Sequence, residues 1–142
     1  MGKPSDDSSD GSVFGNVVYR YSRQQALDDG VLIDPGDMAN EAGFRWPVAL
    51  TAAVWNDCVL WNDADSRQQI YQDQSGRLWD VLYMAINAIR TNKTAGNRLM
   101  YQLYRVPRNG KALEAELVTL KLIVGPGDSG EPVVTILLPE ED

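Results

Sequence analysis

The spacing of the apolar residues changes near residue 97, and this change constrains the fold more than any other feature of the chain. From Arg77 to Arg90, apolar side chains recur every three or four residues, which predicts an amphipathic helix. From Arg98 onward they alternate with polar residues, which is typical of strands that bury one face. The sequence therefore predicts an α+β protein rather than an all-helical or an all-strand one.

The predicted helix 77–90 is apolar over most of its surface. Its main stripe consists of Leu78, Leu82, Ala85, Ile86 and Ile89. Trp79, Val81 and Tyr83 widen this stripe, so we expect the helix to be nearly surrounded by other parts of the protein. The preceding segment, 62–76, is mostly polar, and its sequence is compatible with a short helix or with an ordered loop.

Three segments after residue 97 have the strand pattern: 98–106, 116–124 and 132–139. Asn109-Gly110 separates the first two and the sequence GPGDSGEP separates the last two, and both are turn signals. We therefore expect an antiparallel meander of three strands, with the β-branched and aromatic segment 13–21 as a candidate fourth strand. The long helix and shorter helices would pack against the apolar face of this antiparallel sheet.

The N-terminal third contains a polar tail and the caps of three short helices. Residues 1–12 consist mainly of serine, aspartate and glycine, which predicts a disordered acidic tail before a single domain of residues 13–142. The expected caps are Ser22, Asp37 and Thr51 at helix N-termini and Gly30 and Gly43 at C-termini. For the third helix, Pro47 as its first residue is an alternative start.

Two residue counts exclude many reactions. The 142 residues include no histidine and one cysteine. Without histidine there is no Ser-His-Asp triad, no Cys-His pair and none of the common zinc sites, so we expect no metal and no cofactor. Cys58 lies in an apolar run, which is typical of a buried, reduced thiol. No run of about 20 apolar residues and no signal-peptide pattern is present, so we expect a cytoplasmic protein without a membrane partner.

The net charge of −7 is unevenly distributed along the chain. Residues 1–60 and 112–142 are acidic, whereas residues 61–111 contain eight basic and four acidic side chains. Acidic ends favour attraction to a basic partner surface. The basic residues of the predicted hairpin 98–111 are Arg98, Arg105, Arg108 and Lys111. They are compatible with a nucleic-acid surface, although we favour a solvated hairpin whose charges prevent edge pairing.

Asp73, Arg77 and Asp80 gather at the start of the long helix and are candidates for a polar pocket. Capping rules also account for them, and we favour that interpretation. Asp73 or Ser75 would cap the helix, Asp80 would lie near its positive end, and Arg77 would pair with one of these carboxylates.

Two of the four tryptophans are candidate surface anchors for a partner. Trp46 and Trp61 flank the third predicted helix, whereas Trp55 and Trp79 lie on faces that we expect to be buried.

Several sequence blocks, matched together and in order, resemble a family of small bacterial proteins of unknown function found on plasmids, phages and integrative elements. The blocks are YSRQQALDDGVLID, RWPVALTAAVWNDC, YQDQSGRLWDVLYMA, LYRVPR and LVTLKLIVGPGDSGEPVVTILLPEED, and the resemblance extends from about Phe14 to Asp142. It implies no reaction and no catalytic residues. Occurrence among accessory genes that counter host defences implies a binding protein that inhibits or modulates a host protein.

We therefore expect a non-catalytic protein that binds a protein partner through an acidic surface. The candidate binding residues are Trp46, Trp61, Asp73, Arg77, Asp80, Arg105, Arg108, Glu140, Glu141 and Asp142. One alternative is a nucleic-acid-binding regulator that uses the hairpin 98–111, which the net charge disfavours. Another is a histidine-free hydrolase in which two of Asp57, Asp63, Asp65, Asp73 and Asp80 converge.

Overall fold

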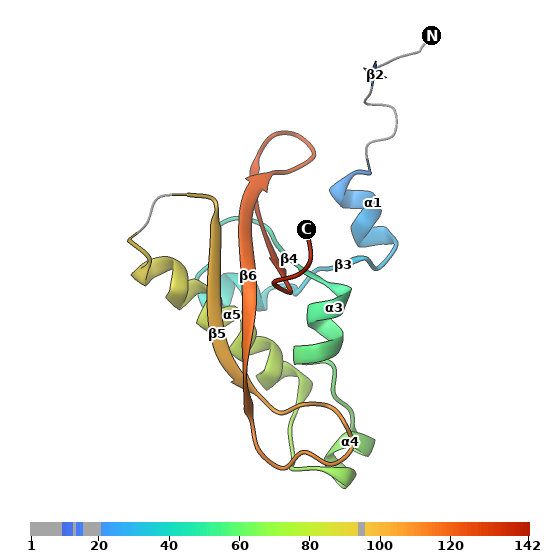
Figure 1. Ribbon diagram of the computed structural model, residues 1–142, viewed down its shortest axis with the longest axis vertical. Helices are drawn as coiled ribbons and strands as arrows, with labels where there is room; N and C mark the ends of the chain where they lie inside the picture. The colour runs from blue at the N-terminus through green and yellow to red at the C-terminus, as the bar shows by residue number, and fades with distance from the viewer. Residues whose placement is uncertain (1–9, 13, 16–20, 94–95) are drawn as a thin grey trace.

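The three segments with alternating apolar residues form antiparallel strands, as predicted. The computed structural model describes residues 10–12, 14–15, 21–93 and 96–142. The three strands are β5 (Arg98–Arg105), β6 (Glu116–Pro126) and β7 (Pro132–Leu137). Tyr101 lies opposite Leu120 and Leu122 lies opposite Ile136. This register places the core residues of the three strands on one face of the sheet: Tyr101, Leu103, Leu120, Leu122, Val134 and Ile136. Figure 1 shows β5 and β6 side by side.

Two further strands make the sheet larger than the sequence predicts. β3 (Leu32–Ile33) pairs antiparallel with β4 (Val48–Thr51), and β4 pairs parallel with β7. The result is a mixed sheet of five strands in the order β3-β4-β7-β6-β5. The expectation of a purely antiparallel sheet of three or four strands is therefore wrong, although the α+β class is correct.

β4 escapes prediction because it is buried on both faces. Val48, Ala49 and Leu50 are all buried, so the strand has no polar face and no alternation. A short apolar run of this kind cannot be distinguished from a helix by periodicity alone. The alternative in which Pro47 opens a helix is wrong, because Pro47 directly precedes β4.

The segment 13–21 adds no described strand to this sheet. Residues 13 and 16–20 lie outside the described residues, and so does the part of the expected acidic tail before residue 10. The described part forms β1 (Asp10–Ser12) and β2 (Phe14–Gly15), which pair only with each other.

The predicted helix caps are largely confirmed. The Ser22 hydroxyl accepts a hydrogen bond from the backbone N–H of Gln25, at 3.0 Å, and begins α1 (Arg23–Asp28). Thr51 caps α3 (Ala52–Val54), which continues as the π-helical turn η1 (Trp55–Val59). α2 (Met38–Ala42) ends at Gly43, as predicted, but Asp37 forms no side-chain cap there.

The polar segment 62–76 forms a short helix and then the cap of the long one. α4 (Asp63–Gln68) begins after Asn62, and α5 (Gln74–Thr91) begins after Asp73. The Asp73 carboxylate accepts a hydrogen bond from the backbone N–H of Gly76, at 2.8 Å. Of the two caps considered for the long helix, Asp73 is therefore the one used.

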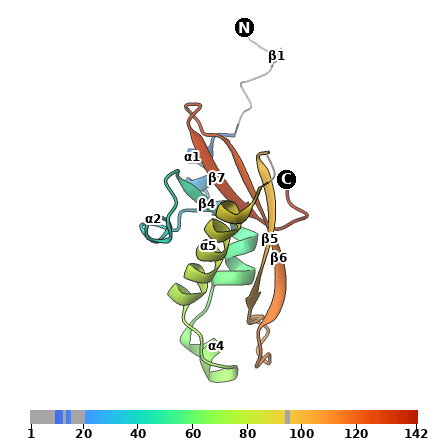
Figure 2. The ribbon, with the colours of Figure 1, turned by 90° about the vertical axis from the view of Figure 1, so that its left-hand side faces the viewer.

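α5 packs across one face of the sheet (Figure 2). Its buried residues include Leu78, Val81, Leu82, Ala85 and Ile86, which contact the apolar residues of β5, β6 and β7. The sheet, η1 and α2 all pack on α5, but the expectation that α5 is nearly surrounded is wrong, because one face of it is exposed: Asp80, Tyr83, Asn87 and Arg90. Tyr83 is 43% exposed and stacks on Trp79, with 5.8 Å between the ring centroids.

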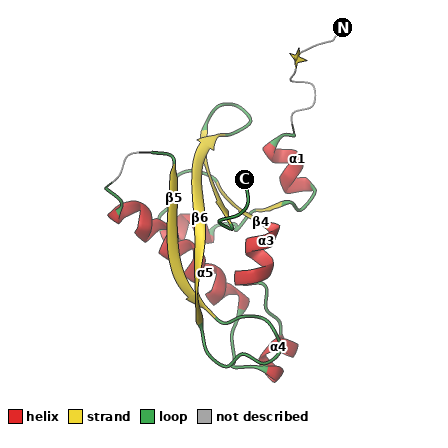
Figure 3. Ribbon diagram, in the orientation of Figure 1, coloured by secondary structure: helices red, strands yellow, loops and turns green. Residues whose placement is uncertain are grey.

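The C-terminal residues cover part of the opposite face of the sheet. Lys121 is buried there, and its ammonium group donates hydrogen bonds to the carbonyl oxygens of Pro139 and Glu141. The Glu141 carboxylate accepts hydrogen bonds from the Thr51 hydroxyl, at 2.7 Å, and from the backbone N–H of Leu138, at 2.8 Å. Figure 3 shows this end of the chain as a loop beside the strands. Among the described helices, none is both long and apolar enough to cross a membrane.

A substitution at Gly43 tests whether the turn after α2 requires glycine. Its φ is +118°, and a Cβ there would lie 2.5 Å from an Arg90 guanidinium nitrogen. We predict that Gly43→Ala lowers the free energy of unfolding by about 1–2 kcal/mol through backbone strain, because the guanidinium is the flexible end of an exposed side chain and can move away from the new Cβ. The measurement is urea denaturation.

Gly30→Ala is the matched control. Gly30 also has a positive φ, +76°, but a Cβ there would meet nothing within 4 Å. Backbone strain alone gives an expected loss of about 1 kcal/mol. Similar losses are therefore expected for the two variants, and a loss for Gly43→Ala that exceeds the other by more than about 1 kcal/mol would contradict the free movement of Arg90.

Candidate functional site

Arg77 joins three parts of the chain at the centre of the candidate site. It is buried on α5, and its guanidinium donates hydrogen bonds to the carbonyl oxygens of Val59 (3.1 Å), Val106 (2.9 Å) and Asp57 (3.4 Å). Asp57 and Val59 belong to the last turn of η1, where carbonyl groups lack helical partners. The expected pairing of Arg77 with Asp73 or Asp80 is therefore wrong. Burial lowers the pKa of the Arg77 guanidinium.

Trp61 covers the face of this guanidinium. The Arg77 carbon lies 4.5 Å from the centroid of the indole ring, and the indole N–H donates a hydrogen bond to the Ser66 hydroxyl at 2.8 Å. Trp61 is 5% exposed, so the expectation that it is a surface anchor is wrong. Trp46 does lie at the surface, where it is 48% exposed. Trp55 and Trp79 are partly buried against the core.

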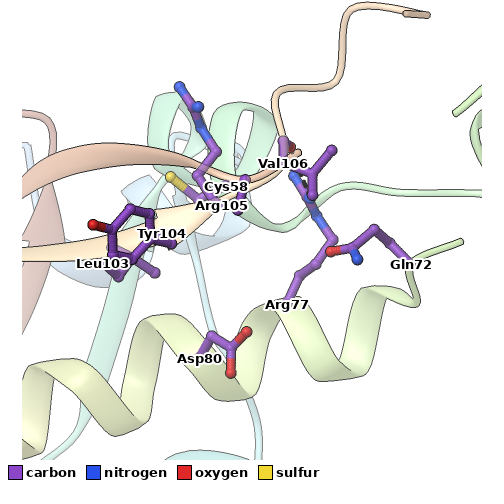
Figure 4. Close-up of a pocket in the computed structure, with 9 residues that line it drawn as sticks. Cys58, Gln72, Arg77, Asp80, Leu103, Tyr104, Arg105 and Val106 are labelled. Atoms are coloured by element: carbon purple, nitrogen blue, oxygen red, sulfur yellow. Dashed lines mark hydrogen bonds between the residues drawn. The ribbon is translucent and has the colours of Figure 1, made fainter. Parts of the chain in front are cut away.

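A cavity of about 180 Å³ lies beside Arg77, between α5 and the end of β5 (Figure 4). It brings together Arg77, Asp80 and Arg105 of the predicted site residues, whereas Asp73 and Arg108 are not part of its lining. Burial raises the pKa of the Asp80 carboxyl, and the charge of Arg77 opposes this effect. Within the described residues, the buried Nε of Arg105 has no hydrogen-bond partner.

The cavity contains one of the five aspartates that the hydrolase alternative requires. Asp57 lies 3.1 Å from Arg105 in an ion pair, Asp65 lies 2.7 Å from Arg108, and Asp73 caps α5. Asp80 alone of the five lines the cavity. The site therefore lacks the pair of converging carboxylates that such a hydrolase needs.

The same ion pairs reduce the positive charge of the predicted basic hairpin 98–111. Two of its four cations, Arg105 and Arg108, are paired with carboxylates, and Arg98 and Lys111 are exposed. Pairing removes much of the positive potential that a phosphate backbone would need. The acidic C-terminal residues also differ from one another: Glu140 and Asp142 are exposed, whereas the carboxylate of Glu141 is held inside the C-terminal turn.

The outer edge of β5 is a feature that the sequence analysis did not identify. Figure 1 shows β5 as the last strand of the sheet, and β6 is its neighbour on one side only. The backbone N–H of Val124 donates to the carbonyl oxygen of Asn97, at 2.8 Å, and the register from there to Arg105 is regular. Because antiparallel neighbours alternate, the odd-numbered residues of β5 bond to β6. Met100, Gln102 and Tyr104 therefore direct their N–H and C=O groups away from the sheet.

A groove of about 480 Å³ borders this edge. Asp80 and Met84 of α5 form one wall of the groove, and β5 forms the other. Three apolar side chains are exposed on the outer face beside it: Met100 (48%), Tyr104 (67%) and Leu117 (52%). These side chains occupy the alternate positions that a strand with one buried face normally fills with polar residues. Their presence there was a usable sequence signal.

The fold and the site define a small α+β protein with a mixed sheet, an arginine-centred cavity and a long uncovered edge strand. The chain belongs to the family of unknown function DUF6573, whose model matches residues 13–142. A comparison with curated proteins and one with solved structures give no match. The family description states no activity, so the occurrence on mobile elements and the defence-related role remain predictions.

Arg77→Met tests whether the guanidinium holds η1 and the end of β5 against α5. We expect a loss of about 3 kcal/mol or more in the free energy of unfolding, because three carbonyl groups lose a charged donor. Urea denaturation measures this loss. The control is Arg67→Met on the exposed side of α4, which should change stability by less than about 0.5 kcal/mol. A similar small change for Arg77→Met would contradict the structural role.

Cys58 should be an inert thiol. It is buried, as the sequence predicts, and burial, assisted by the Asp57 charge, raises its pKa from 9.0 to about 12. At pH 8 its thiolate fraction is about a thousandfold below that of a free cysteine, and its reaction with DTNB should be slower in proportion. The folded state also binds this proton more tightly, so stability should fall as the pH rises from 9 towards 12.

The control for Cys58 is the same DTNB reaction in urea, where the unfolded thiol should react freely. A rate in the folded protein within tenfold of the unfolded rate would contradict the burial of the thiol.

Proposed function

We propose that the protein is a non-catalytic binding protein that captures an extended, basic segment of a partner protein along the edge of β5. The single observation that supports this function most strongly is the row of unpaired backbone groups on Met100, Gln102 and Tyr104 beside the groove. A host protein is the class of partner that the resemblance to mobile-element proteins implies.

The backbone of β5 is suited to strand addition. The strand has eight residues, contains no proline and pairs with β6 in a regular register without a bulge. Sheet edges are normally protected by prolines, bulges, very short strands or inward-pointing charges. The charges of β5 stand at its two ends, where Arg105 is paired with Asp57, and the residues between the ends, 99–104, carry no charge. An open stretch of this length presents N–H and C=O groups whose spacing matches another strand, which is the basis of peptide recognition by strand addition.

Side chains on both faces of the edge would contact an added strand. Met100, Tyr104 and Leu117 are exposed on the outer face. Tyr104 and Leu117 also line the groove, together with Met84 and Leu103 on the side of α5. Alternate side chains of an extended segment point to opposite faces. A partner segment with apolar residues at alternate positions would therefore contact both groups.

The charge of the groove favours a basic segment. Asp80 forms one wall of the groove, and among the described residues it has no ion-pair partner. A lysine or arginine of the bound segment would form an ion pair with Asp80. The net charge of −7, to which the exposed Glu140 and Asp142 contribute, would accelerate the approach of a basic partner and oppose pairing of two copies of the chain.

A random-sequence peptide library displayed on phage tests this function directly. We expect the enriched peptides to share alternating apolar residues and at least one lysine or arginine. On binding of a synthetic peptide from this set, the backbone amides of Met100, Gln102 and Tyr104 should gain protection from hydrogen exchange. Gln102→Pro removes one outward-facing N–H and should weaken binding about tenfold. Lys111→Gln, an exposed change in the neighbouring loop, is the control and should have no effect.

Asp80→Asn tests the role of charge separately. It should weaken binding of the basic peptide but leave unchanged the binding of a peptide whose cation is replaced by glutamine. Protection of amides outside β5, or full affinity of the Gln102→Pro variant, would contradict the proposed function. A dimer in sedimentation experiments that Gln102→Pro dissociates would identify a second copy, rather than a partner protein, as the occupant of the edge.

A further inference from the structure

We infer that the cavity beside Trp46 binds a small amphipathic carboxylate, in which an apolar and preferably aromatic body is joined to a single negative charge. This cavity lies between α5, the loop before β4 and the pair β6-β7, and none of its lining residues belongs to the edge groove of β5. The inference is therefore independent of the proposed function.

The cavity has the size and the walls of a ligand site. Its volume is about 450 Å³, within the range of roughly 300–1,000 Å³ that small-molecule sites occupy. One wall is the segment from Gly43 to Trp46, and the other is the C-terminal half of α5. Val124 and Val134, which lie opposite each other in β6 and β7, close it from the side of the sheet.

The apolar lining fits a flat hydrophobic body. Ile86, Ile89, Val124 and Val134 supply branched aliphatic surface, and Trp46 stands beside them with about half of its side chain in solvent. A half-exposed indole at the rim of an aliphatic cavity gains apolar contact when a planar group lies against it.

Two arginines at the same cavity supply the charge that the ligand would need to match. Arg45 and Arg90 both line it, and within the part of the chain that the structure describes neither guanidinium has an ion pair or a hydrogen bond. Arg105 and Arg108, by contrast, are each held by an aspartate. A guanidinium group binds a carboxylate through two parallel hydrogen bonds. Arg45 and Arg90 therefore favour a ligand that carries a carboxylate.

Gly43 leaves room for the Arg90 guanidinium at the wall of the cavity. A Cβ at residue 43 would lie 2.5 Å from an Arg90 guanidinium nitrogen, so the guanidinium occupies space that a larger residue would fill. Residue 43 also has a positive φ, which glycine adopts without strain. A glycine at this position therefore lets the Arg90 charge lie beside the apolar lining.

Neighbouring acidic groups favour a ligand with a single charge. A second cavity of about 360 Å³ shares Arg45 and Trp46 with the first and is lined by Asp34 and Asp37. These carboxylates reduce the positive potential near Arg45 and oppose a doubly charged group. A monoanionic carboxylate is therefore favoured over a phosphate monoester.

Isothermal titration calorimetry with four probes tests the inference: naphthoate, decanoate, naphthol and inorganic phosphate. We expect naphthoate to bind with a Kd on the order of 0.1 mM. Naphthol lacks the charge and phosphate lacks the apolar body, so each should bind at least tenfold more weakly. Decanoate distinguishes an aliphatic from an aromatic carboxylate, and we expect it to bind more weakly than naphthoate because it cannot stack on Trp46.

Variants locate the binding in the cavity. Arg90→Met, Arg45→Met and Trp46→Ala should each weaken naphthoate binding about tenfold, and Arg67→Met, an exposed arginine outside the cavity, should not change it. Thermal unfolding confirms that each variant is folded. In the folded wild type, naphthoate should also shift the NMR signal of the Trp46 indole N–H, which Trp46→Phe assigns. The inference is overturned if neither carboxylate binds, if naphthol binds as tightly as naphthoate, or if the three cavity variants retain full affinity.

Discussion

The buried guanidinium of Arg77 is the interaction on which the arrangement of helices and sheet depends. It belongs to α5, but it donates to carbonyl groups in η1 and at the end of β5. Arginine suits this position because its planar group has five donors, so one side chain can satisfy carbonyls from two separate segments. The indole of Trp61 stabilises the charge from one face, and no carboxylate is needed. Residues of α5 and β5 line both the small cavity and the edge groove.

Much of the fold could be predicted from local patterns, because those patterns have local causes. The caps at Ser22 and Thr51 are hydrogen bonds within three residues, and β5, the first strand of the meander, alternates buried and exposed residues. β4 could not be predicted in this way, because its parallel partner β7 lies more than 80 residues later and both of its faces are buried. For the same reason Tyr83 was assigned to a covered surface: apolar character alone does not show which side of a helix the sheet will cover.

In the candidate site, some of the residues could be predicted from the sequence, but their contacts could not. The predicted grouping of Arg77 with Asp80 is correct, since both line the cavity, but the predicted carboxylate partner of Arg77 is wrong. The actual partners are carbonyl groups, which every residue has, so no sequence pattern marks them. The position of Trp61 beside the third predicted helix predicts a surface residue, whereas the indole ring is buried against the Arg77 guanidinium. Met100, Tyr104 and Leu117 are apolar residues at strand positions where polar residues are expected. Periodicity identifies the strand but gives no reason to treat these exceptions as a surface.

The unpredicted strand β4 also explains why the two edges of the sheet differ. Because β4 pairs with β7, β7 is an interior strand, and β3 forms the edge of the sheet on that side. β3 is only two residues long and packs beside α1, so it offers little backbone for another strand. At the opposite edge, β5 is eight residues long, and α5 lies close enough to form a groove without covering the strand. Sheet edges are ordinarily shortened or covered because open ones aggregate. One edge of the sheet is protected, and the other is open beside Asp80, which has no ion-pair partner among the described residues of this acidic protein. This asymmetry is the structural support for the proposed binding role.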